Sequence, residues 1–192
     1  MKKKDLKDRG EEIESLVVLI KKGDHDAFSK LYDIFIDPLY RYVYYRVNAD
    51  DAEDILETVF LKVWENIKKY KKGTNFSAWI FRIAHNLVVD YYRSSKDREF
   101  QELNIQIPDD KREHNPIKTT ERSFNQEILK KGLSKLKKRY QEIIIYKFIN
   151  GFSNKEIAKM MKKSEGSLRI LQYRALKALK REFEDMGIDY HI

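Results

Sequence analysis

Apolar residues recur along most of this chain at intervals of three and four, the spacing that places them on one face of an α-helix. The pattern is clearest over residues 51–67. Its apolar positions are Ala52, Ile55, Leu56, Val59, Phe60, Val63, Trp64 and Ile67. The same spacing predicts helices over residues 27–47 and 76–93, and no stretch alternates convincingly with the two-residue period of a strand. The expected fold class is therefore all-α.

Residues 153–181 have the pattern of a helix-turn-helix. Ser153 and Glu156 have the spacing of a capping box, which defines the start of a first helix. The turn is expected at residues 162–163, and Ser164 is the expected N-cap of the second helix.

The second helix of this motif has two chemically distinct faces. At about 100° per residue, one narrow face is apolar and consists of Leu168, Leu171, Ala175 and Leu179. The opposite face carries Arg169, Ile170, Tyr173, Arg174, Lys177 and Arg181. Such a helix can pack on its own domain with one side and enter a DNA major groove with the other. The alternative is an ordinary amphipathic helix whose basic face is only solvated.

The charge of the chain is concentrated in the same region. The sequence has 192 residues and a net charge of +8. Residues 126–192 hold 16 Lys and Arg against 8 Asp and Glu, which equals the whole excess. Residues 1–96 hold 18 against 16, and residues 97–125 hold 5 against 7. A cation-rich C-terminal part is expected of a protein that meets nucleic-acid phosphates.

Residues 97–125 have the composition of a linker, with Pro108, Pro116, mixed charges and few large apolar side chains. They divide an expected N-terminal helical domain, residues 10–96, from an expected C-terminal domain, residues 126–187. The predicted architecture is two small helical domains joined by a flexible linker.

Composition also narrows the chemistry. The absence of cysteine excludes disulfides, thiolate-ligated zinc and cysteine nucleophiles. The four histidines, His25, His85, His114 and His191, are scattered, and the sequence shows no nucleophile–base pair or phosphate-binding glycine loop. We therefore expect no catalytic activity, no metal and no cofactor. The longest apolar run near the start, residues 16–20, is far shorter than the roughly 20 residues that span a bilayer, so a cytoplasmic location is expected.

Three segments together resemble the bacterial RNA polymerase sigma factors of the extracytoplasmic-function group. They are DAEDILETVFLKVWE (51–65), NFSAWIFRIAHNLVVDYYR (75–93) and SNKEIAKMM…SEGSLRILQYRALKAL in the helix-turn-helix. With their flanking helices, the resemblance covers about residues 14–184. It implies a subunit that binds core RNA polymerase and directs promoter-specific initiation. It also implies an N-terminal domain that melts the −10 element, a C-terminal domain that reads the −35 element, and an anti-sigma partner.

The resemblance assigns polymerase binding to the outward face of the helix at 51–67. The residues implied are Asp51, Asp54, Glu57, Leu61 and Glu65. Acidic groups around one exposed leucine suit a basic partner surface, because charge steers the encounter and the apolar centre supplies affinity. Two other interpretations stay open: a solvated face with capping carboxylates, and a Mg²⁺ site, although acids on one helical turn point in different directions. Glu57 and Thr58 stand where the group usually has Gln and Glu.

The resemblance assigns opening of the −10 element to the third predicted helix and the loop before it. The residues implied are Lys71, Lys72, Gly73, Thr74, Asn75, Arg82, Asn86, Asp90 and Arg93. In the group, an asparagine and this loop form a pocket for a flipped base, and Asn86 is the matching residue. The helical period places Trp79 and Tyr91 in the core and directs His85 and Tyr92 outward. Tyr92 then either stacks on a base or has no role.

In the C-terminal domain, the resemblance assigns contact with the −35 element to a largely basic set of residues. They are Arg139, Lys155, Ser167, Arg169, Ile170, Tyr173, Arg174 and Lys177. Arg139 and Lys155 suit phosphate contacts, and Ile170 suits a thymine methyl or the sugar–phosphate wall. Lys137 stands where the group commonly has a proline. Two functions of other classes remain as alternatives: an operator-binding regulator that dimerises on paired half-sites, and a nucleic-acid-modifying enzyme.

Overall fold

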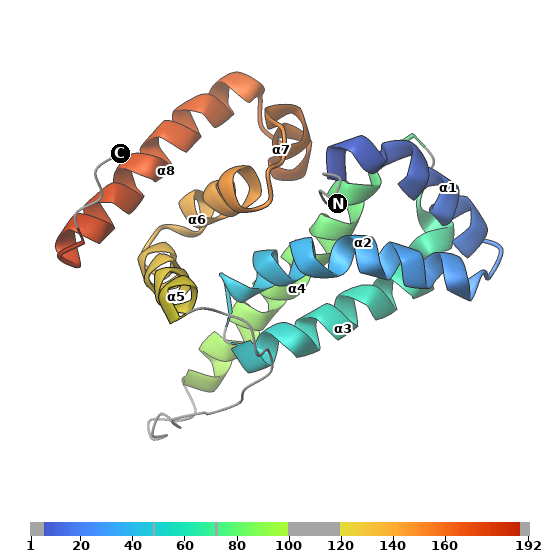
Figure 1. Ribbon diagram of the computed structural model, residues 1–192, viewed down its shortest axis with the longest axis horizontal. Helices are drawn as coiled ribbons and strands as arrows, with labels where there is room; N and C mark the ends of the chain where they lie inside the picture. Colours follow the sequence, from blue (N-terminus) through green and yellow to red (C-terminus); the bar gives the residue numbers. More distant parts are fainter. Residues whose placement is uncertain (1–5, 48, 72, 100–119, 189–192) are drawn as a thin grey trace.

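The computed structural model describes residues 6–47, 49–71, 73–99 and 120–188, and these residues form helices without any β-strand (Figure 1). The N-terminal half contains η1 (Leu6–Arg9), α1 (Gly10–Ile20), α2 (His25–Tyr44), α3 (Ala49–Asn66), η2 (Ile67–Lys69) and α4 (Phe76–Glu99). The C-terminal half contains α5 (Thr120–Ser134), α6 (Lys138–Ile144), η3 (Ile145–Ile149), α7 (Asn154–Met161) and α8 (Glu165–Asp185). The predicted all-α fold class is confirmed. None of the helices in these ranges has the length and apolar character needed to cross a membrane.

The four α-helices of the N-terminal half surround one apolar core. α2 is central, because it packs against α1, α3 and α4. Its residues Leu31, Phe35, Leu39 and Tyr42 follow the helical period and are fully buried. Each large apolar side chain buried in this way contributes roughly 1.5–3 kcal/mol to folding. The core therefore fixes the directions in which the outer faces of α3 and α4 point.

The C-terminal half is built along the long helix α8, which lies on the outer side of α6 (Figure 1). Leu168, Ala175 and Leu179 are buried, as the apolar stripe predicted. α5 reaches α8 through Gly132, where an added Cβ would lie 2.7 Å from Cε1 of Phe183. Glycine at this position therefore permits the close approach of the two helices.

The helix-turn-helix is confirmed in its local detail. The backbone N–H of Ser153 donates to Oε2 of Glu156 at 2.9 Å, and the N–H of Glu156 donates to Oγ of Ser153 at 3.3 Å. α7 ends at Met161, and its C-cap residue Lys162 has a φ of 52°, in the left-handed region. Oγ of Ser164 accepts from the N–H of Ser167 at 3.2 Å and caps α8. The capping chemistry read from the sequence thus sets both helix starts.

Other boundaries differ from the prediction. α1 was not among the predicted helices, and α4 continues past Arg93 to Glu99. α5 begins at Thr120, so helices occupy both ends of the predicted linker. The middle of that linker, residues 100–119, lies outside the described residues. The domain limits stay a prediction.

The two halves are in contact with each other. α4 packs against α7, and α2 packs against η3. η3 is one turn of π-helix, in which the N–H of Asn150 donates to the carbonyl of Ile145 at 2.9 Å. This turn places the ring of Tyr146 against that of Tyr42, with ring centroids 5.2 Å apart. The structure is therefore a joined pair of helical units.

The capping box predicts a measurable contribution to stability. Ser153→Ala removes the oxygen that accepts from Glu156 N–H, and it should lower the free energy of unfolding by about 1 kcal/mol. Urea denaturation followed by circular dichroism measures this change. Ser29→Ala, at an exposed position inside α2, is the matched control and should change stability by much less. Equal effects of the two substitutions would contradict the structural role of the cap.

Candidate nucleic-acid interface

The outward face of α8 is exposed, as its helical pattern predicted. Ile170 is 56% exposed and Tyr173 is 68% exposed. Arg169, Arg174 and Lys177 are exposed beside them. Positive charge together with an accessible aromatic ring suits contact with phosphates and base edges. The placement of these side chains is confirmed, and their contact with DNA stays a prediction.

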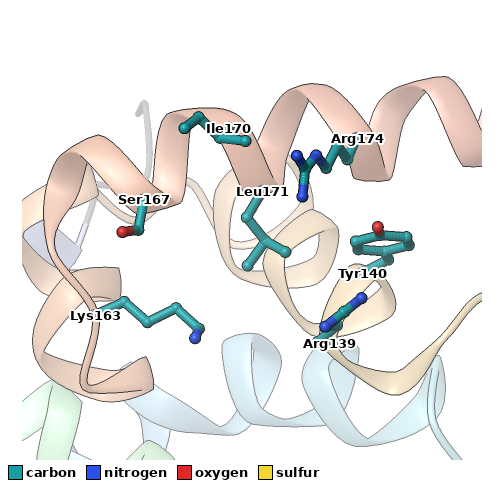
Figure 2. A pocket seen from close by; sticks show the side chains of 7 residues that line it. All are labelled: Arg139, Tyr140, Lys163, Ser167, Ile170, Leu171 and Arg174. Atoms are coloured by element: carbon teal, nitrogen blue, oxygen red, sulfur yellow. The ribbon is translucent and has the colours of Figure 1, made fainter.

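A cation-rich pocket of about 270 Å³ lies between α6 and the N-terminal half of α8. Its lining residues are Arg139, Tyr140, Lys163, Ser167, Ile170, Leu171 and Arg174. Figure 2 shows Arg139 coming from α6, Arg174 from α8, and Lys163 from the turn between α7 and α8. None of the lining side chains is acidic. Three converging cations without a carboxylate favour an anion such as a DNA phosphate. We call this the cationic pocket.

The pocket unites four of the predicted residues and adds Tyr140, Leu171 and one further cation, Lys163. Arg139, Ser167, Ile170 and Arg174 were predicted to contact the upstream element, and all four line the pocket. The sequence pattern places Lys163 only in the turn between the two helices. Because the turn follows the left-handed end of α7, its side chain lies beside α6 and α8. A lysine within the turn of a helix-turn-helix was the available signal.

Four other predicted residues are not in the lining of the cationic pocket: Arg169, Tyr173, Lys177 and Lys155. The first three continue along the exposed face of α8, and Lys155 is exposed in the first turn of α7. All four side chains are accessible and lie outside the pocket. Such a surface suits groove contacts more than capture of a single ion.

The acidic face predicted for α3 is exposed over most of its length. Asp54, Glu57 and Glu65 are exposed, and Leu61 is 57% exposed. Asp51 differs, because its Oδ2 accepts a hydrogen bond at 2.7 Å from the hydroxyl of Tyr91 in α4. Asp51 is therefore half-buried and ties α3 to α4, so the freely presented face runs from Asp54 to Glu65.

On α4, the predicted DNA-contacting residues form one exposed stripe. Arg82, Asn86, Asp90 and Arg93 follow each other at intervals of three or four residues, and each is exposed. Because this spacing is close to the helical period, the four side chains point to the same side. Their arrangement can follow a strand of nucleic acid along the helix. Trp79 and Tyr91, predicted to be core residues, are half-buried.

The loop before α4 is held by local hydrogen bonds. The hydroxyl of Tyr70 lies within hydrogen-bonding distance of the carbonyl of Thr74 and of the carboxylate of Glu14, and its single proton is shared between these two acceptors. Burial, and then the hydrogen bond to Glu14, raise the pKa of Tyr70 to about 12, so the hydroxyl remains a donor. Oδ1 of Asn75 accepts from the N–H of Ala78 at 2.9 Å and caps α4.

Between Tyr70 and Asn75 the described loop residues face solvent. Lys71, Gly73 and Thr74 are exposed, and Gly73 has a φ of +86°, which glycine adopts without strain. Lys72 lies outside the described residues. The exposed part of the loop is thus fixed at both ends, by Tyr70 and by the Asn75 cap.

Two residues of α4 were predicted to point outward and do not. Nδ1 of His85 lies 2.7 Å from Oε1 of Glu142 in α6, and the hydroxyl of Tyr92 donates to the backbone carbonyl of Arg46. The helical period of α4 alone distinguishes a buried side from the rest. It could not reveal that the C-terminal half packs against a second side.

No group of three or more His, Asp or Glu side chains within the described ranges is placed to hold a metal ion. The acids at the start of α3 were the candidate for Mg²⁺. Asp51 bonds to Tyr91, whereas Glu53 and Asp54 are exposed. The described carboxylates of this turn therefore do not converge on one point: Asp51 makes a contact within the protein, and Glu53 and Asp54 face solvent.

Comparison with known proteins identifies the family. A family model of sigma-70 region 2 matches residues 31–98, and one of sigma-70 region 4 matches residues 126–179. The chain is 35% identical over 172 residues to the ECF RNA polymerase sigma factor BldN of Streptomyces coelicolor, covering 88% of this chain and 65% of BldN. It is 26% identical over 186 residues to the ECF RNA polymerase sigma factor SigW of Bacillus subtilis, covering 91% of this chain and 98% of SigW. The chain belongs to the extracytoplasmic-function (ECF) group of RNA polymerase sigma factors.

The fold is also shared with a solved structure. The sigma factor RpoE of Bartonella quintana, in a co-crystal with the anti-sigma factor NepR, matches with a TM-score of 0.67 and 20% sequence identity. The match covers 82% of this chain and 96% of that chain. At 20% sequence identity, this similarity shows a shared fold. With respect to length, the chain spans just under two thirds of BldN.

The cationic pocket predicts a sequence-independent contribution to DNA binding. Arg139→Ala and Lys163→Ala should each weaken binding to any duplex and reduce the slope of log affinity against log salt by about 0.9, the value for one lost phosphate contact. Fluorescence anisotropy at several salt concentrations measures both effects. Lys180→Ala removes an exposed cation farther along α8 and should leave the slope unchanged. An unaltered slope in both pocket variants would contradict phosphate binding there.

Proposed function

We propose that this protein binds core RNA polymerase and directs it to specific promoters. In this proposal α4 opens the −10 element, and the helix-turn-helix reads the −35 element. The observation that carries it is the presence, in one chain, of a region 2 with an exposed acidic helix and a region 4 with a cationic recognition helix. BldN and SigW bear the name of RNA polymerase sigma factors, which supports the same function.

Polymerase binding is assigned to α3. Leu61 is exposed among the carboxylates of Asp54, Glu57 and Glu65. Burying a leucine against a partner contributes roughly 1.5–3 kcal/mol, and the surrounding charge accelerates encounter with a basic surface. A face of this composition repels DNA, so its partner is a protein with positive charge.

Promoter opening is assigned to the exposed stripe of α4. A base flipped out of the duplex loses stacking energy, which the protein must offset through hydrogen bonds and contact. The amide of Asn86 both donates and accepts, so it can pair with a base edge. Arg82 and Arg93 lie on the same stripe and suit the flanking phosphates. The loop ending at Asn75 lies directly before this helix.

Recognition of the −35 element is assigned to α8, with two kinds of contact. Arg169 and Tyr173 on the open face suit base edges in the major groove. Arg139 and Lys163, in the cationic pocket, suit the phosphate backbone and would set the depth and angle of the helix. A rival function, an operator-binding regulator without polymerase, would leave the acidic face of α3 without a role.

An anti-sigma partner also belongs to the proposal. It is supported by the co-crystal of RpoE with the anti-sigma factor NepR. Because this sequence has no cysteine, any thiol-based sensing would reside in that partner. RNA synthesis itself belongs to the polymerase, and a polymerase subunit of bacteria acts in the cytoplasm.

The acidic face should be needed for polymerase and dispensable for folding. Asp54→Lys combined with Leu61→Arg changes exposed positions, so helix content should remain normal. Affinity for core polymerase should fall at least about a hundredfold, because an unpaired charge in the centre of an interface is poorly tolerated. Co-migration with core polymerase on size exclusion, with titrated subunit, measures the affinity. Leu19→Arg with Asp26→Lys is the matched control, since it alters an exposed leucine and an exposed acid elsewhere in the same half. Wild-type affinity of the α3 variant would refute the assignment.

Asn86 should act in promoter opening and not in assembly. Asn86→Ala should leave the melting temperature and the polymerase affinity nearly unchanged, because the side chain is exposed. It should reduce strand opening on duplex promoters, and templates already unpaired at the −10 element should restore much of the loss. Permanganate footprinting on the two template types, beside a melting curve, gives the comparison. A large fall in stability, or normal opening of the duplex, would exclude the pocket role.

A further inference from the structure

α4 presents a face that the proposed function does not use. One side of the helix packs into the N-terminal core, and another carries the exposed stripe. The third side consists of Phe81, His85 and Tyr92, each of which contacts the C-terminal half. A helix assigned to nucleic acid is thus partly occupied by the other half of its own chain.

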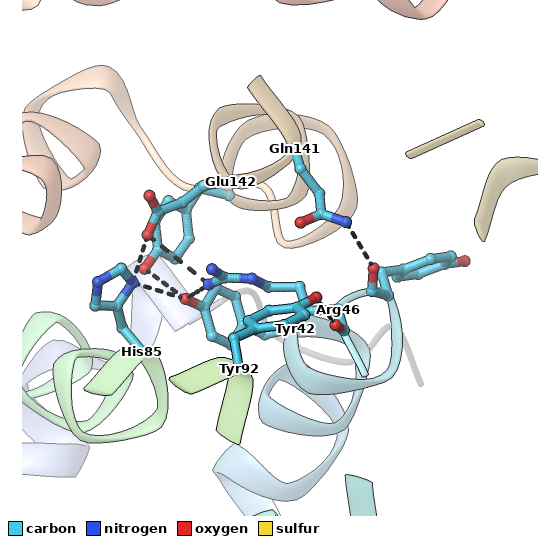
Figure 3. Close-up of polar contacts among 8 residues, drawn as sticks. Tyr42, Arg46, His85, Tyr92, Gln141 and Glu142 are labelled. Atoms are coloured by element: carbon cyan, nitrogen blue, oxygen red, sulfur yellow. Dashed lines mark hydrogen bonds and ion pairs between the residues drawn. The ribbon is translucent and has the colours of Figure 1, made fainter. Parts of the chain in front are cut away.

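A polar network joins the halves at this face (Figure 3). Oε1 of Glu142 lies 2.7 Å from Nδ1 of His85 and 3.9 Å from Nη1 of Arg46. The Arg46 guanidinium donates to the hydroxyl of Tyr42, and the hydroxyl of Tyr146 donates to that of Tyr42 at 3.3 Å. Tyr42 and Arg46 come from the C-terminal end of α2 and the residues after it, His85 from α4, and Glu142 and Tyr146 from the C-terminal half. We call these five residues the clasp.

The clasp is charged and mostly buried: Tyr42, Tyr146 and Arg46 are buried, the Glu142 side chain is 14% exposed, and the His85 side chain, at the edge, is 35% exposed. Arg46 is only 5% exposed. Burial alone would raise the pKa of the Glu142 carboxyl, but the hydrogen bond from His85 and the charge of Arg46 outweigh it and hold the pKa below its ordinary value. Glu142 is therefore ionised at neutral pH and balances Arg46. If Glu142 were neutralised, the buried guanidinium of Arg46 would lose the carboxylate that α6 places beside it. An unpaired buried charge is costly, so the joined state would be strongly disfavoured.

Contact between the halves covers Tyr92, which lies next to the proposed DNA-contacting stripe. The ammonium of Lys138 lies 3.7 Å from the ring centroid of Tyr92, and the Tyr92 hydroxyl donates to the carbonyl of Arg46. Tyr92 directly precedes Arg93, which is on the stripe. The ring is therefore beside the expected path of an unpaired strand, but α6 occupies its face.

We propose that the clasp is an autoinhibitory contact, which holds the halves together and covers Tyr92, and that its release frees the Tyr92 ring to stack on unpaired bases. Stacking on a tyrosine is tolerant of sequence because every base has a π-face. The proposal rests on the proposed function only in taking nucleic acid as the partner of α4.

The first experiment measures the distance between the halves. Because the sequence has no cysteine, Ser29→Cys in α2 and Lys180→Cys in α8 accept a donor and an acceptor dye without competing sites. Single-molecule energy transfer on the full chain should show one compact population. Glu142→Gln in this background should raise the separated population at least about tenfold, whereas Glu165→Gln, which neutralises an exposed acid on α8, should not.

Folding is checked by circular dichroism. His85→Ala, which removes the nearer of the two clasp partners of Glu142 without altering α6, is the second variant and should shift the populations in the same direction. An unchanged distribution in both folded variants would overturn the clasp.

The second experiment measures access to Tyr92 with a fluorescent oligothymidine strand as the probe. Glu142→Gln should bind the strand about tenfold more tightly than wild type, in line with one added stacking contact. Adding Tyr92→Ala to Glu142→Gln should remove that gain. Separation of the halves without tighter binding, or a gain that survives Tyr92→Ala, would overturn the masking of Tyr92. Neither experiment includes polymerase or a promoter, so failure of the proposed function would leave these results interpretable.

Discussion

Burial of four aromatic rings at the junction of the halves is the interaction on which the arrangement depends. Tyr42 and Tyr146 stack with centroids 5.2 Å apart, and Phe81 meets Phe152 edge-on at 4.8 Å. All four side chains are fully or almost fully buried. Each such pair adds roughly 0.5–1.5 kcal/mol beyond the burial of apolar area. The rings also exclude water from the neighbouring charges of Arg46 and Glu142, and a dry site makes their pairing effective.

The distribution of charge separates the functions assigned to the molecule. Carboxylates surround Leu61 on α3, whereas three cations converge between α6 and α8. Opposite signs on different halves suit a basic protein surface on one half and a phosphate backbone on the other, as the proposed function requires. Both surfaces are exposed, so the interactions proposed for them should weaken as salt rises. The Arg46–Glu142 pair is largely buried and is screened much less.

Features encoded by neighbouring residues could be predicted from the sequence. The apolar periods of α2, α3 and α4 were sufficient to identify these helices, and the caps at Ser153 and Ser164 placed the helix-turn-helix. These signals are local, because a capping side chain bonds to an N–H two or three residues away. The outward residues of α8 followed from the same period.

Features that depend on packing between distant segments could not be predicted. A single helical period separates one buried side from the rest, so it predicted that His85 and Tyr92 face solvent. It gave no sign that Asp51 would bond to Tyr91 on the next helix. Lys163 was recognisable as a turn residue but not as a neighbour of Arg139. In each case the missing information was the position of a second helix.

The π-helical turn η3 has a consequence for how this chain tolerates change. A π-turn holds one more residue than an α-helical turn, and here it brings Tyr146 round to Tyr42. Losing a single residue from this turn would restore the ordinary helix and rotate what precedes or follows it by about 100°. The amino-acid composition of both halves would be almost the same, yet the rings would no longer meet. Length, at this one turn, is therefore as strict a requirement as the identity of any side chain.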